Sequence, residues 1–488
     1  MATPSRTTPT GSRAPRTAVV VGAGMVGLAT AWHLQERGVE VTVLDREGVA
    51  AGSSWGNAGW LTPGMAMPLA DPTLWTYAPK ALLDPAAPLH VPARLDPRLW
   101  SFLARFAAHA TQRAWDRAMA ALTPIDRLAL DAFDELSAHG VAARSTPGPF
   151  AIGFEDERQA APFLHEIAQV EAAGQVVPLR RIDQPDGAAH RSGPSHPDAG
   201  LGTGASDAVG HATPATRPGG GREPGASGAV GHASASTSPD ASRAPEASGA
   251  VGRPAQLTDR VRAVYALEGQ RFIEPGPFVG ALGDAVRARG GRIVTGATVT
   301  GLRAQEGRGV QALVDGQDPV VADVAVLATG AWLPGLARPL GVRTLVQAGR
   351  GYSFTVKTDL PVEQPIYLPS RRVACTPYQG RFRIAGTMEF RGPDEPFQPR
   401  RIEAILASVR DLFQGVDLDD RHDEWVGSRP VTPDGLPLVG ATRAPGVYVA
   451  GGHGMWGIVL GPATGRLLAE QIVTGTVPQE IRAFDPLR

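Results

Sequence analysis

A glycine-rich turn between two short strands near the N-terminus constrains the fold more than any other feature of the chain. The apolar run Ala18–Val21 leads directly into Gly22-Ala23-Gly24-Met25-Val26-Gly27, and the periodicity that follows predicts a helix over Leu28–Arg37. A second strand is expected over Glu40–Leu44, closed by Asp45. Strand, glycines, helix, strand and acid in this order predict a βαβ unit that binds a dinucleotide.

The residues of this turn have distinct physical roles in such a unit. Gly22 permits the tight turn, Gly24 lets the backbone approach a pyrophosphate, and Gly27 lets the helix pack closely on the strand. The helix N-terminus offers free N–H groups and its positive dipole end to phosphates. Asp45 lies at the spacing expected for hydrogen bonds to a ribose hydroxyl. The predicted contacts here are Gly22, Gly24, Met25, Val26, Gly27, Asp45 and Arg46.

The rest of the chain favours FAD over NAD. An NAD-binding fold usually continues with further βαβ units, whereas this chain runs into the small polar loop Gly52–Gly59. The remaining nucleotide-fold strands are expected much later, at 297–302, in a hairpin of 309–314 and 320–321, at 324–327 and at 447–450. A glycine turn and a helix over 462–473 follow, and a helix N-terminus there would stabilise a negatively charged reduced flavin. Further predicted cofactor contacts are Ser53, Ser54, Asn57, Ala58, Gly59, Val299, Thr329, Gly330, Trp332, Gly452, His453, Gly454, Met455 and Gly457.

Two residues in these regions allow two interpretations each. His453, flanked by glycines, either assists the flavin or serves as a capping or packing residue. Cys375 lies in the apolar run 373–376, where a buried packing role is favoured over a flavin anchor.

Composition excludes several classes of protein. The chain has 488 residues and a formal net charge of −1, which gives no long-range attraction for nucleic acid. A single cysteine excludes an internal disulfide framework and a cysteine-rich metal site. No stretch approaches the roughly 20 apolar residues that span a bilayer. We therefore expect a cytoplasmic protein that has at most peripheral contact with the inner membrane face and binds no metal.

A low-complexity segment divides the globular sequence. Residues 184–256 are rich in Gly, Pro, Ser and Ala, and the unit 205–211 returns imperfectly as 226–232 and 247–253. Each unit offers a single valine for a core, so a disordered insertion is predicted rather than a solenoid. His190, His196, His211 and His232 are spaced too widely to favour a metal site.

We expect two domains around this insertion, after a disordered tail at 1–16. The FAD-binding domain is predicted to be discontinuous, with residues 17–70, 257–340 and 426–488. Residues 71–183 and 341–425 are assigned to a substrate or cap domain.

Three stretches of the chain resemble those of a known family. The stretches 22–64, 349–388 and 425–472 resemble D-amino-acid dehydrogenases of the D-amino-acid oxidase and glycine oxidase superfamily. The most specific parts of this resemblance are residues 57–64, 350–353 and 429–437. The resemblance implies an α/β and α+β protein, with an interrupted Rossmann-like, glutathione-reductase-like FAD-binding domain. It also implies non-covalent FAD beneath a mixed-sheet substrate domain.

The resemblance also implies a role for Arg429. In the superfamily the matching arginine binds the substrate carboxylate, which a planar guanidinium can hold through two hydrogen bonds. A structural ion pair is the alternative. Glycine oxidase adds a tyrosine and a second arginine, but Ala374 and Met455 stand at those positions. Tyr352 is the favoured replacement donor of a hydroxyl, with Tyr367 and Tyr378 as alternatives and a core role for these aromatic residues also open.

The activity expected from these residues is FAD-dependent oxidative deamination of a small amino acid, with a D-amino acid as the leading substrate class, by hydride transfer from Cα to flavin N5. The alternatives are an oxidase of glycine, sarcosine or another N-substituted amino acid, and a non-catalytic flavoprotein. The electron acceptor is left open between a quinone, oxygen and a carrier protein.

Overall fold

The computed structural model describes residues 14–182, 252–305 and 309–488, all of which belong to one compact unit. The four histidines and the repeat units considered above lie outside these residues, except for the last two residues of the third unit, Gly252 and Arg253. Within the described ranges, no group of three or more His, Cys, Asp and Glu side chains could hold a metal ion. No helix in these ranges has the length and apolar character needed to cross a membrane.

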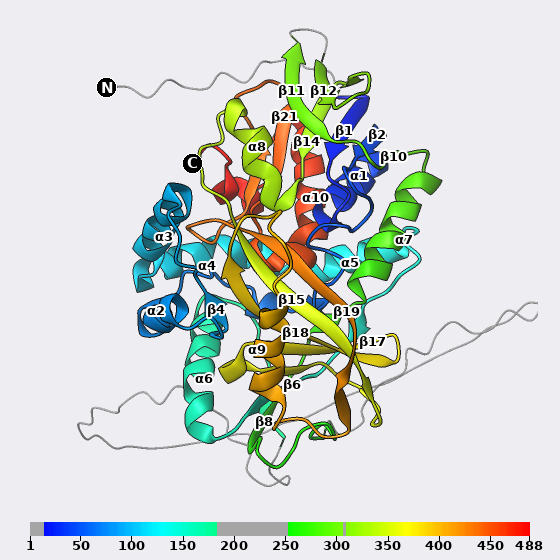
Figure 1. Cartoon of the computed structure of the whole chain (residues 1–488). Helices are drawn as coiled ribbons and strands as arrows, with labels where there is room; N and C mark the ends of the chain where they lie inside the picture. The colour runs from blue at the N-terminus through cyan, green and yellow to red at the C-terminus, as the bar shows by residue number, and fades with distance from the viewer. Residues whose placement is uncertain (1–13, 183–251, 306–308) are drawn as a thin grey trace, which may run out of the picture. The chain divides into compact units, whose positions relative to one another are not determined.

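The first layer is a six-stranded sheet with strand order β10-β2-β1-β14-β21-β20 (Figure 1). All neighbours pair in parallel except β20 and β21, which pair antiparallel. The strands are β1 (Thr17–Val21), β2 (Glu40–Leu44), β10 (Arg292–Val294), β14 (Val324–Leu327), β20 (Leu438–Ala441) and β21 (Val447–Gly451).

Both faces of this sheet are covered, which explains its continuous apolar strands. Val20 packs into a core with helices α1 (Met25–Glu36), α7 (Pro275–Ala288) and α10 (Gly457–Thr474). Val19 faces the opposite core. That side is covered by the meander β11 (Val299–Gln305), β12 (Gly309–Val314) and β13 (Val320–Ala322) and by α8 (Leu333–Ala337). The predicted Rossmann-like fold is therefore present, with its segments widely separated along the chain.

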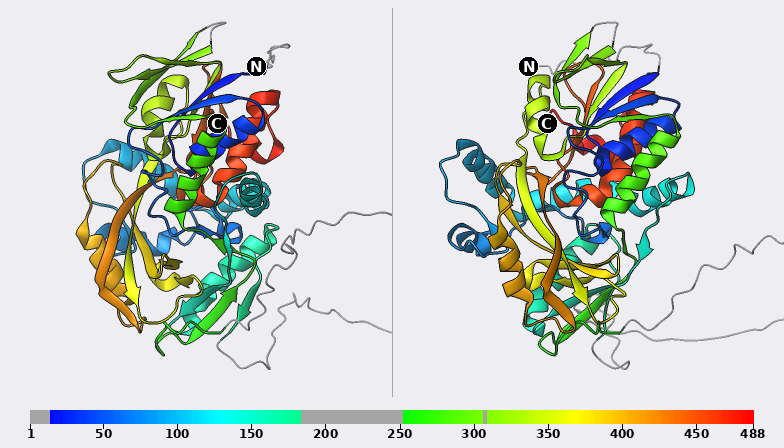
Figure 2. Two further views of the ribbon diagram at one scale, coloured as in Figure 1. Left: turned by 90° about the vertical axis from the view of Figure 1, so that its right-hand side faces the viewer. Right: turned by 45° about the vertical axis from the view of Figure 1, so that its right-hand side comes forward.

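The second layer is a nine-stranded mixed sheet, ordered β19-β15-β18-β17-β16-β6-β8-β7, with β4 paired to β18. Its long strands β15, β18 and β19 run together in yellow and orange in Figure 2. The strands are β4 (Leu89–His90), β6 (Phe150–Phe154), β7 (Leu179–Arg181), β8 (Ala263–Leu267), β15 (Gln347–Thr358), β16 (Ile366–Leu368), β17 (Val373–Tyr378), β18 (Arg381–Phe390) and β19 (Val416–Val431).

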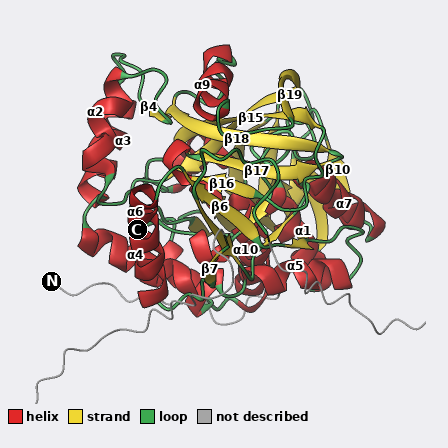
Figure 3. Cartoon of the chain, turned by 90° about the horizontal axis from the view of Figure 1, so that it is seen from below, coloured by secondary structure: helices red, strands yellow, loops and turns green. Residues whose placement is uncertain are grey.

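Helix α9 (Pro399–Val409) packs on one face of this sheet (Figure 3). That core contains Cys375, fully buried and unpaired, so its predicted packing role is confirmed. The other helices are α2 (Leu74–Leu83), α3 (Pro97–His109), α4 (Gln112–Asp126), α5 (Ala129–Ala138) and α6 (Glu157–Ala172). A small sheet joins β3 (Trp60–Leu61), β9 (Arg271–Phe272) and β5 (Thr146–Pro147).

Several element boundaries differ from the sequence prediction. Helix α1 begins at Met25 rather than Leu28, and α10 begins at Gly457 rather than Pro462. Gly27 therefore lies inside α1, and only glycine fits there, because a Cβ would stand 2.0 Å from the carbonyl oxygen of Gly22. Strand β11 starts two residues later than expected and continues to Gln305.

The segment boundaries also need correction. Arg16, placed in the tail, donates its backbone N–H to Asp323 at 2.7 Å. Gln256, placed in the insertion, is 2% exposed and donates to the carbonyl of Pro361 at 2.6 Å. Strand β8 pairs with β6 and β7, so residues 263–267 lie in the nine-stranded sheet rather than with the FAD-binding strands. Strand β19 runs unbroken through the boundary expected at 425–426. The division into two domains stays a prediction.

Helices α1 and α10 approach each other through glycines. A Cβ on Gly465 would stand 2.6 Å from the backbone of Ala29, and one on Gly461 would stand 2.6 Å from Cγ of Met25. A larger residue at Gly465 would therefore force backbone atoms apart, since no flexible side-chain end can move aside.

We expect Gly465→Ala to lower the free energy of unfolding by about 1–3 kcal/mol through overpacking. Gly280→Ala is the matched control, because Gly280 also lies inside a helix but has no atom within 4 Å of the added Cβ. Helix propensity predicts that this control raises stability by up to ~1 kcal/mol. Chemical denaturation of both variants tests the difference, and equal effects would contradict the packing argument.

Candidate active site

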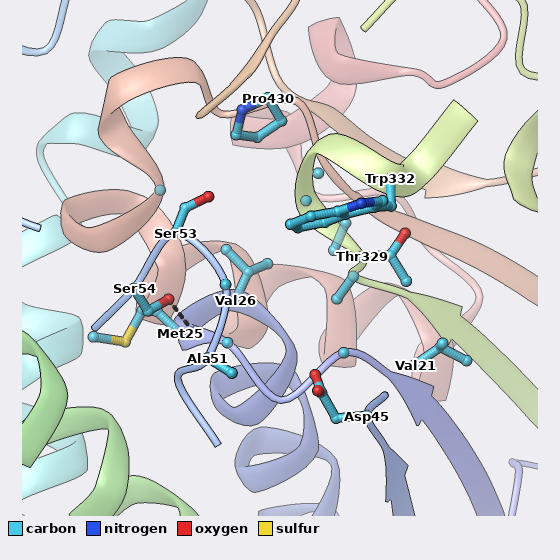
Figure 4. A pocket seen from close by; sticks show the side chains of 18 of the residues that line it. Val21, Met25, Val26, Asp45, Ala51, Ser53, Ser54, Thr329, Trp332 and Pro430 are labelled. Atoms are coloured by element: carbon cyan, nitrogen blue, oxygen red, sulfur yellow. Dashed lines mark hydrogen bonds between the residues drawn. The ribbon is translucent and has the colours of Figure 1, made fainter. Parts of the chain in front are cut away.

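A cavity of about 430 Å³ lies at the carboxyl ends of β1, β2, β14 and β21. This is the edge at which open parallel sheets bind ligands. Figure 4 shows side chains from Val21 to Trp332 converging on it. The predicted residues that line it are Gly22, Gly24, Met25, Val26, Asp45, Arg46, Ser53, Ser54, Asn57, Val299, Thr329, Gly330, Trp332, Arg429, His453, Gly454, Met455 and Gly457.

The N-terminus of α1 opens onto this cavity. Gly24 is its N-cap and has no side chain to cap the helix, and the first turn holds no acidic residue. Ser54 accepts a hydrogen bond from the Met25 N–H at 3.2 Å and so ties the polar loop to this turn (Figure 4). Gly22 has a φ of +114°, and a Cβ there would stand 2.4 Å from the carbonyl oxygen of Ala328. The turn therefore needs glycine and leaves backbone donors for a phosphate group.

Asp45 closes the turn after β2. Its carboxylate accepts from the N–H groups of Ala23 at 2.8 Å and of Glu47 and Gly48 at 2.9 Å. Nearby, the Arg46 guanidinium lies 4.2 Å from the ring centroid of Trp332. These contacts hold a carboxylate and an aromatic ring at the cavity wall, where a ribose and an adenine could be bound.

The other end of the cavity is formed by a second helix N-terminus. Helix α10 begins at Gly457 with no side-chain cap and no acid in its first turn. His453 is buried and shares a 3.0 Å hydrogen bond with the hydroxyl of Thr464, and burial lowers the pKa of His453 to about 4. Its imidazole is therefore neutral at pH 7. Among the described residues, the Thr329 hydroxyl at the cavity wall is buried without a hydrogen-bond partner.

The polar loop Gly52–Gly59 joins this cavity to the nine-stranded sheet. Ser53 donates to the carbonyl of Ser428, and Ser353 donates to the carbonyl of Gly56 at 2.7 Å. The Ala58 carbonyl accepts from Thr376 at 2.7 Å.

Four predicted cofactor contacts do not line the cavity. The residues are Gly27, Ala58, Gly59 and Gly452. Ala58 and Gly59 instead pack the loop against its supports, since a Cβ on Gly59 would stand 2.1 Å from the carbonyl oxygen of Ile273. Gly27 and Gly452 similarly lie against protein atoms, so their importance is in packing.

Arg429 reaches the same cavity from β19. Its guanidinium donates weakly to the carbonyl of Thr387 at 3.4 Å, and it forms no ion pair with any described residue. Burial lowers its pKa to about 10, so it stays cationic at pH 7. The structural ion-pair interpretation therefore has no support in the described part of the chain. A partly buried cation without a carboxylate fits an anionic ligand group.

Gly351 of β15 makes room for this guanidinium. A Cβ on Gly351 would stand 2.0–2.2 Å from Nη1, Cζ and Nη2 of Arg429. A side chain at position 351 would overlap the Arg429 guanidinium, so the observed position of the guanidinium requires glycine at 351.

Tyr352 needs correction as a catalytic candidate. Its side chain is 1% exposed and its hydroxyl donates to Glu389 at 2.5 Å, in the core beneath α9. Because side chains alternate between the faces of a strand, Tyr352 points away from the cavity that Arg429 lines. Tyr378 contacts Arg383, and Tyr367 packs against Trp60, and neither lines this cavity.

Part of the cavity lining lies outside the residues predicted from the sequence. The lining residues that were not predicted are Val21, Leu44, Glu47, Ala51, Gly52, Ala297, Thr298, Thr300, Ala328, Gly335, Leu336, Pro430, Ala450, Gly451 and Ile458. Many adjoin predicted residues at strand ends, so extending each motif by one position would have found them. Gly335 and Leu336 belong to α8 and carry no motif.

The cavity residues fit FAD. Two helix N-termini whose N-cap residues make no side-chain hydrogen bond face one cavity, and the Thr329 hydroxyl and the Asp45 carboxylate offer polar partners. The fold and site together define a flavin-dependent oxidoreductase.

Comparison with known proteins agrees with this class. The model of the family described as FAD dependent oxidoreductase (DAO) matches residues 17–212 and 233–471. The chain therefore belongs to this family and is an FAD-dependent oxidoreductase. A D-amino acid dehydrogenase of Xanthobacter autotrophicus is 30% identical over 468 residues, which is 94% of this chain and 96% of the relative. One of Methylobacterium nodulans is 30% identical over 470 residues, with the same coverage.

Solved structures share the fold. Glycine oxidase from Geobacillus kaustophilus superposes with a TM-score of 0.63 at 17% identity, covering 98% of this chain and 99% of the other. L-proline dehydrogenase from P. horikoshii gives 0.62 at 14% identity, covering 98% of each chain.

We expect Gly351→Ala to weaken binding of a small carboxylate such as benzoate by at least about tenfold, the cost of one charge-assisted hydrogen bond. FAD content, measured in parallel, separates this effect from loss of the cofactor, since Arg429 also lines the cofactor cavity. The matched control is Gly301→Ala in β11, where the added Cβ would meet Leu313 at an ordinary 3.7 Å. Titration followed by the flavin spectrum measures both variants. Unchanged affinity in Gly351→Ala would show that the guanidinium does not bind the carboxylate.

Proposed function

We propose that this protein oxidises a D-amino acid to the corresponding imino acid, using non-covalently bound FAD. The observation that carries the proposal is the unpaired guanidinium of Arg429 at the wall of the cofactor cavity. The names of the two relatives support a D-amino acid as the substrate class. Glycine, sarcosine and other N-substituted amino acids are the competing substrates.

The chain's own residues would act mainly by positioning. Arg429 holds the substrate carboxylate through two N–H donors, which fixes the α-carbon in the cavity. The N-terminus of α1 would hold the pyrophosphate of the cofactor, and that of α10 would stabilise the negative charge of the reduced flavin. The redox chemistry, removal of a hydride from the α-carbon, would be supplied by bound FAD. The neutral His453 holds its position through Thr464 and adds no charge.

The role proposed for Arg429 predicts a specific loss of catalytic efficiency. We expect Arg429→Lys to retain FAD but to reduce kcat/KM for D-amino acids by roughly ten- to a hundredfold, because an ammonium cannot reproduce the planar two-point contact. Oxidation of amines that lack a carboxylate should change little. Anaerobic flavin bleaching against D- and L-amino acids, glycine, sarcosine and proline gives both the substrate class and the loss. Full efficiency toward every carboxylated amine in Arg429→Lys would rule out the carboxylate role.

We also propose that the surface of α2 and α3 makes peripheral contact with an anionic membrane. Five large apolar side chains are exposed on these helices and on the segment just before α3, at Trp75, Leu82, Leu83, Leu95 and Trp100. Exposed Lys80, Arg98 and Arg105 lie on the same two helices. Aromatic and leucine side chains beside basic ones are typical of interfacial helices.

This contact predicts binding to phosphatidylglycerol vesicles that weakens as salt rises, because part of the attraction is electrostatic. Substituting Trp75 and Leu83 with Ser should abolish co-sedimentation, whereas the same change at exposed Val321 and Val477, which lie elsewhere in the fold, should not. Equal sedimentation of both double variants would rule out the α2–α3 surface.

A further inference from the structure

The carboxylate site around Arg429 has room for a second donor. A carboxylate offers about four acceptor positions, and a guanidinium in planar contact fills only part of them. The remaining positions need other donors when the ligand is buried. Tyr352, predicted to supply a hydroxyl, donates to Glu389 in the core instead.

Thr387 of β18 is the residue that Arg429 already contacts. The carbonyl of Thr387 accepts the 3.4 Å hydrogen bond from Nη1 of Arg429. The residue is 8% exposed, and its side-chain hydroxyl is buried without a hydrogen-bond partner in the described part of the chain. Because an unpaired buried hydroxyl costs free energy, this group is suited to pair with a ligand.

The register of the sheet indicates that this hydroxyl is on the side of the polar loop. Ala385 pairs with Ser353, whose side chain bonds to that loop, and Thr387 stands two residues farther along β18. Side chains two residues apart share a face of a strand. Met388, the next residue, also reaches this face, because a Cβ on Gly349 would stand 2.8 Å from its Sδ.

The backbone of Thr387 is in an unfavourable conformation. Thr387 and Met388 together oppose Gly351 in a β-bulge, and Thr387 has a φ of +52°. Glycine is the usual residue at a left-handed bulge position, and a β-branched residue there is a rare outlier. A strained residue beside a ligand site points to a function for its side chain.

We propose that the Thr387 hydroxyl is a second donor to the substrate carboxylate, beside the guanidinium of Arg429. The carbonyl of Thr387 holds Nη1 of Arg429, and its hydroxyl donates to the carboxylate that this guanidinium binds. Because both groups belong to one residue, the left-handed backbone fixes how far apart they lie. The inference rests on the proposed function, since it requires a substrate with a carboxylate.

Benzoate binding to the full-length oxidised holoenzyme, followed by the flavin spectrum, tests this role without turnover. Thr387→Val removes the hydroxyl but keeps the branched shape, and should raise the Kd of benzoate by at least about tenfold. Thr387→Ser should restore most of the affinity, because it retains the hydroxyl. Thr387→Gly should bind as weakly as the valine variant, although it relieves the left-handed backbone. The matched control is Thr442→Val, which removes a hydroxyl of an equally exposed residue that bonds to Ala444 and does not line the cavity.

Full affinity in Thr387→Val or Thr387→Gly would overturn the proposal, as would an equal loss in Thr442→Val. If Thr387→Val fails to retain FAD, the comparison of the serine and glycine variants decides, because both lack the branched methyl group.

Two parallel measurements separate this proposal from the proposed function. If Arg429→Lys weakens benzoate binding and Thr387→Val does not, only the role of Thr387 is wrong. Failure of the unaltered protein to bind benzoate would overturn the roles of both residues. The expected order of benzoate affinities, without flavin bleaching by any D-amino acid, would support Thr387 and contradict only the proposed substrate class.

Discussion

The hydrogen bonds between the polar loop Gly52–Gly59 and the nine-stranded sheet are the interaction on which the site depends. Ser353, Thr376 and Arg383 stand on one face of that sheet and donate to loop carbonyls. The opposite end of the loop is joined to the first turn of α1 through Ser54. Because the loop is bonded to both sides, the arginine on the sheet and the helix N-terminus on the nucleotide fold are held at one cavity.

Two arginines, the buried Arg383 and the partly buried Arg429, give the site its electrostatic character. Among the described residues, Arg429 and Arg383 form no ion pair with a carboxylate, and burial lowers the pKa of each. Leaving a buried cation without a counterion costs free energy unless other groups solvate it. Arg383 is stabilised by loop carbonyls and by the Tyr378 ring, so its charge is already bound by protein groups and holds the loop against the sheet. Arg429 has only one long hydrogen bond, and its charge remains available to a ligand.

The nucleotide half of the site could be predicted closely from sequence. Its contacts depend on local geometry, since Gly22, Gly24 and Asp45 act within one βαβ unit. The half of the site on the nine-stranded sheet was predicted less well, because the face to which a side chain points there depends on how the strands pair. Tyr352 and Arg429 both belong to the matched motifs, yet one points into the core and the other into the cavity. A bulge in the pairing of β15 with β18 lies beside Tyr352, and no local pattern reveals it.

The sequence by itself determined where the nucleotide-fold strands and the glycine turns lie along the chain, and which class of cofactor they bind. Backbone sterics and helix dipoles act over a few residues, so a local pattern is enough to reveal them. Tertiary structure alone decided which distant groups meet. Gly351 and Arg429 are 78 residues apart, yet the pairing of β15 with β19 makes them occupy adjoining space. The contacts of Arg383 with Asn57 and Tyr378 likewise exist only in the folded chain. Such contacts follow from strand register, which is fixed by burial over the whole sheet rather than by neighbouring residues.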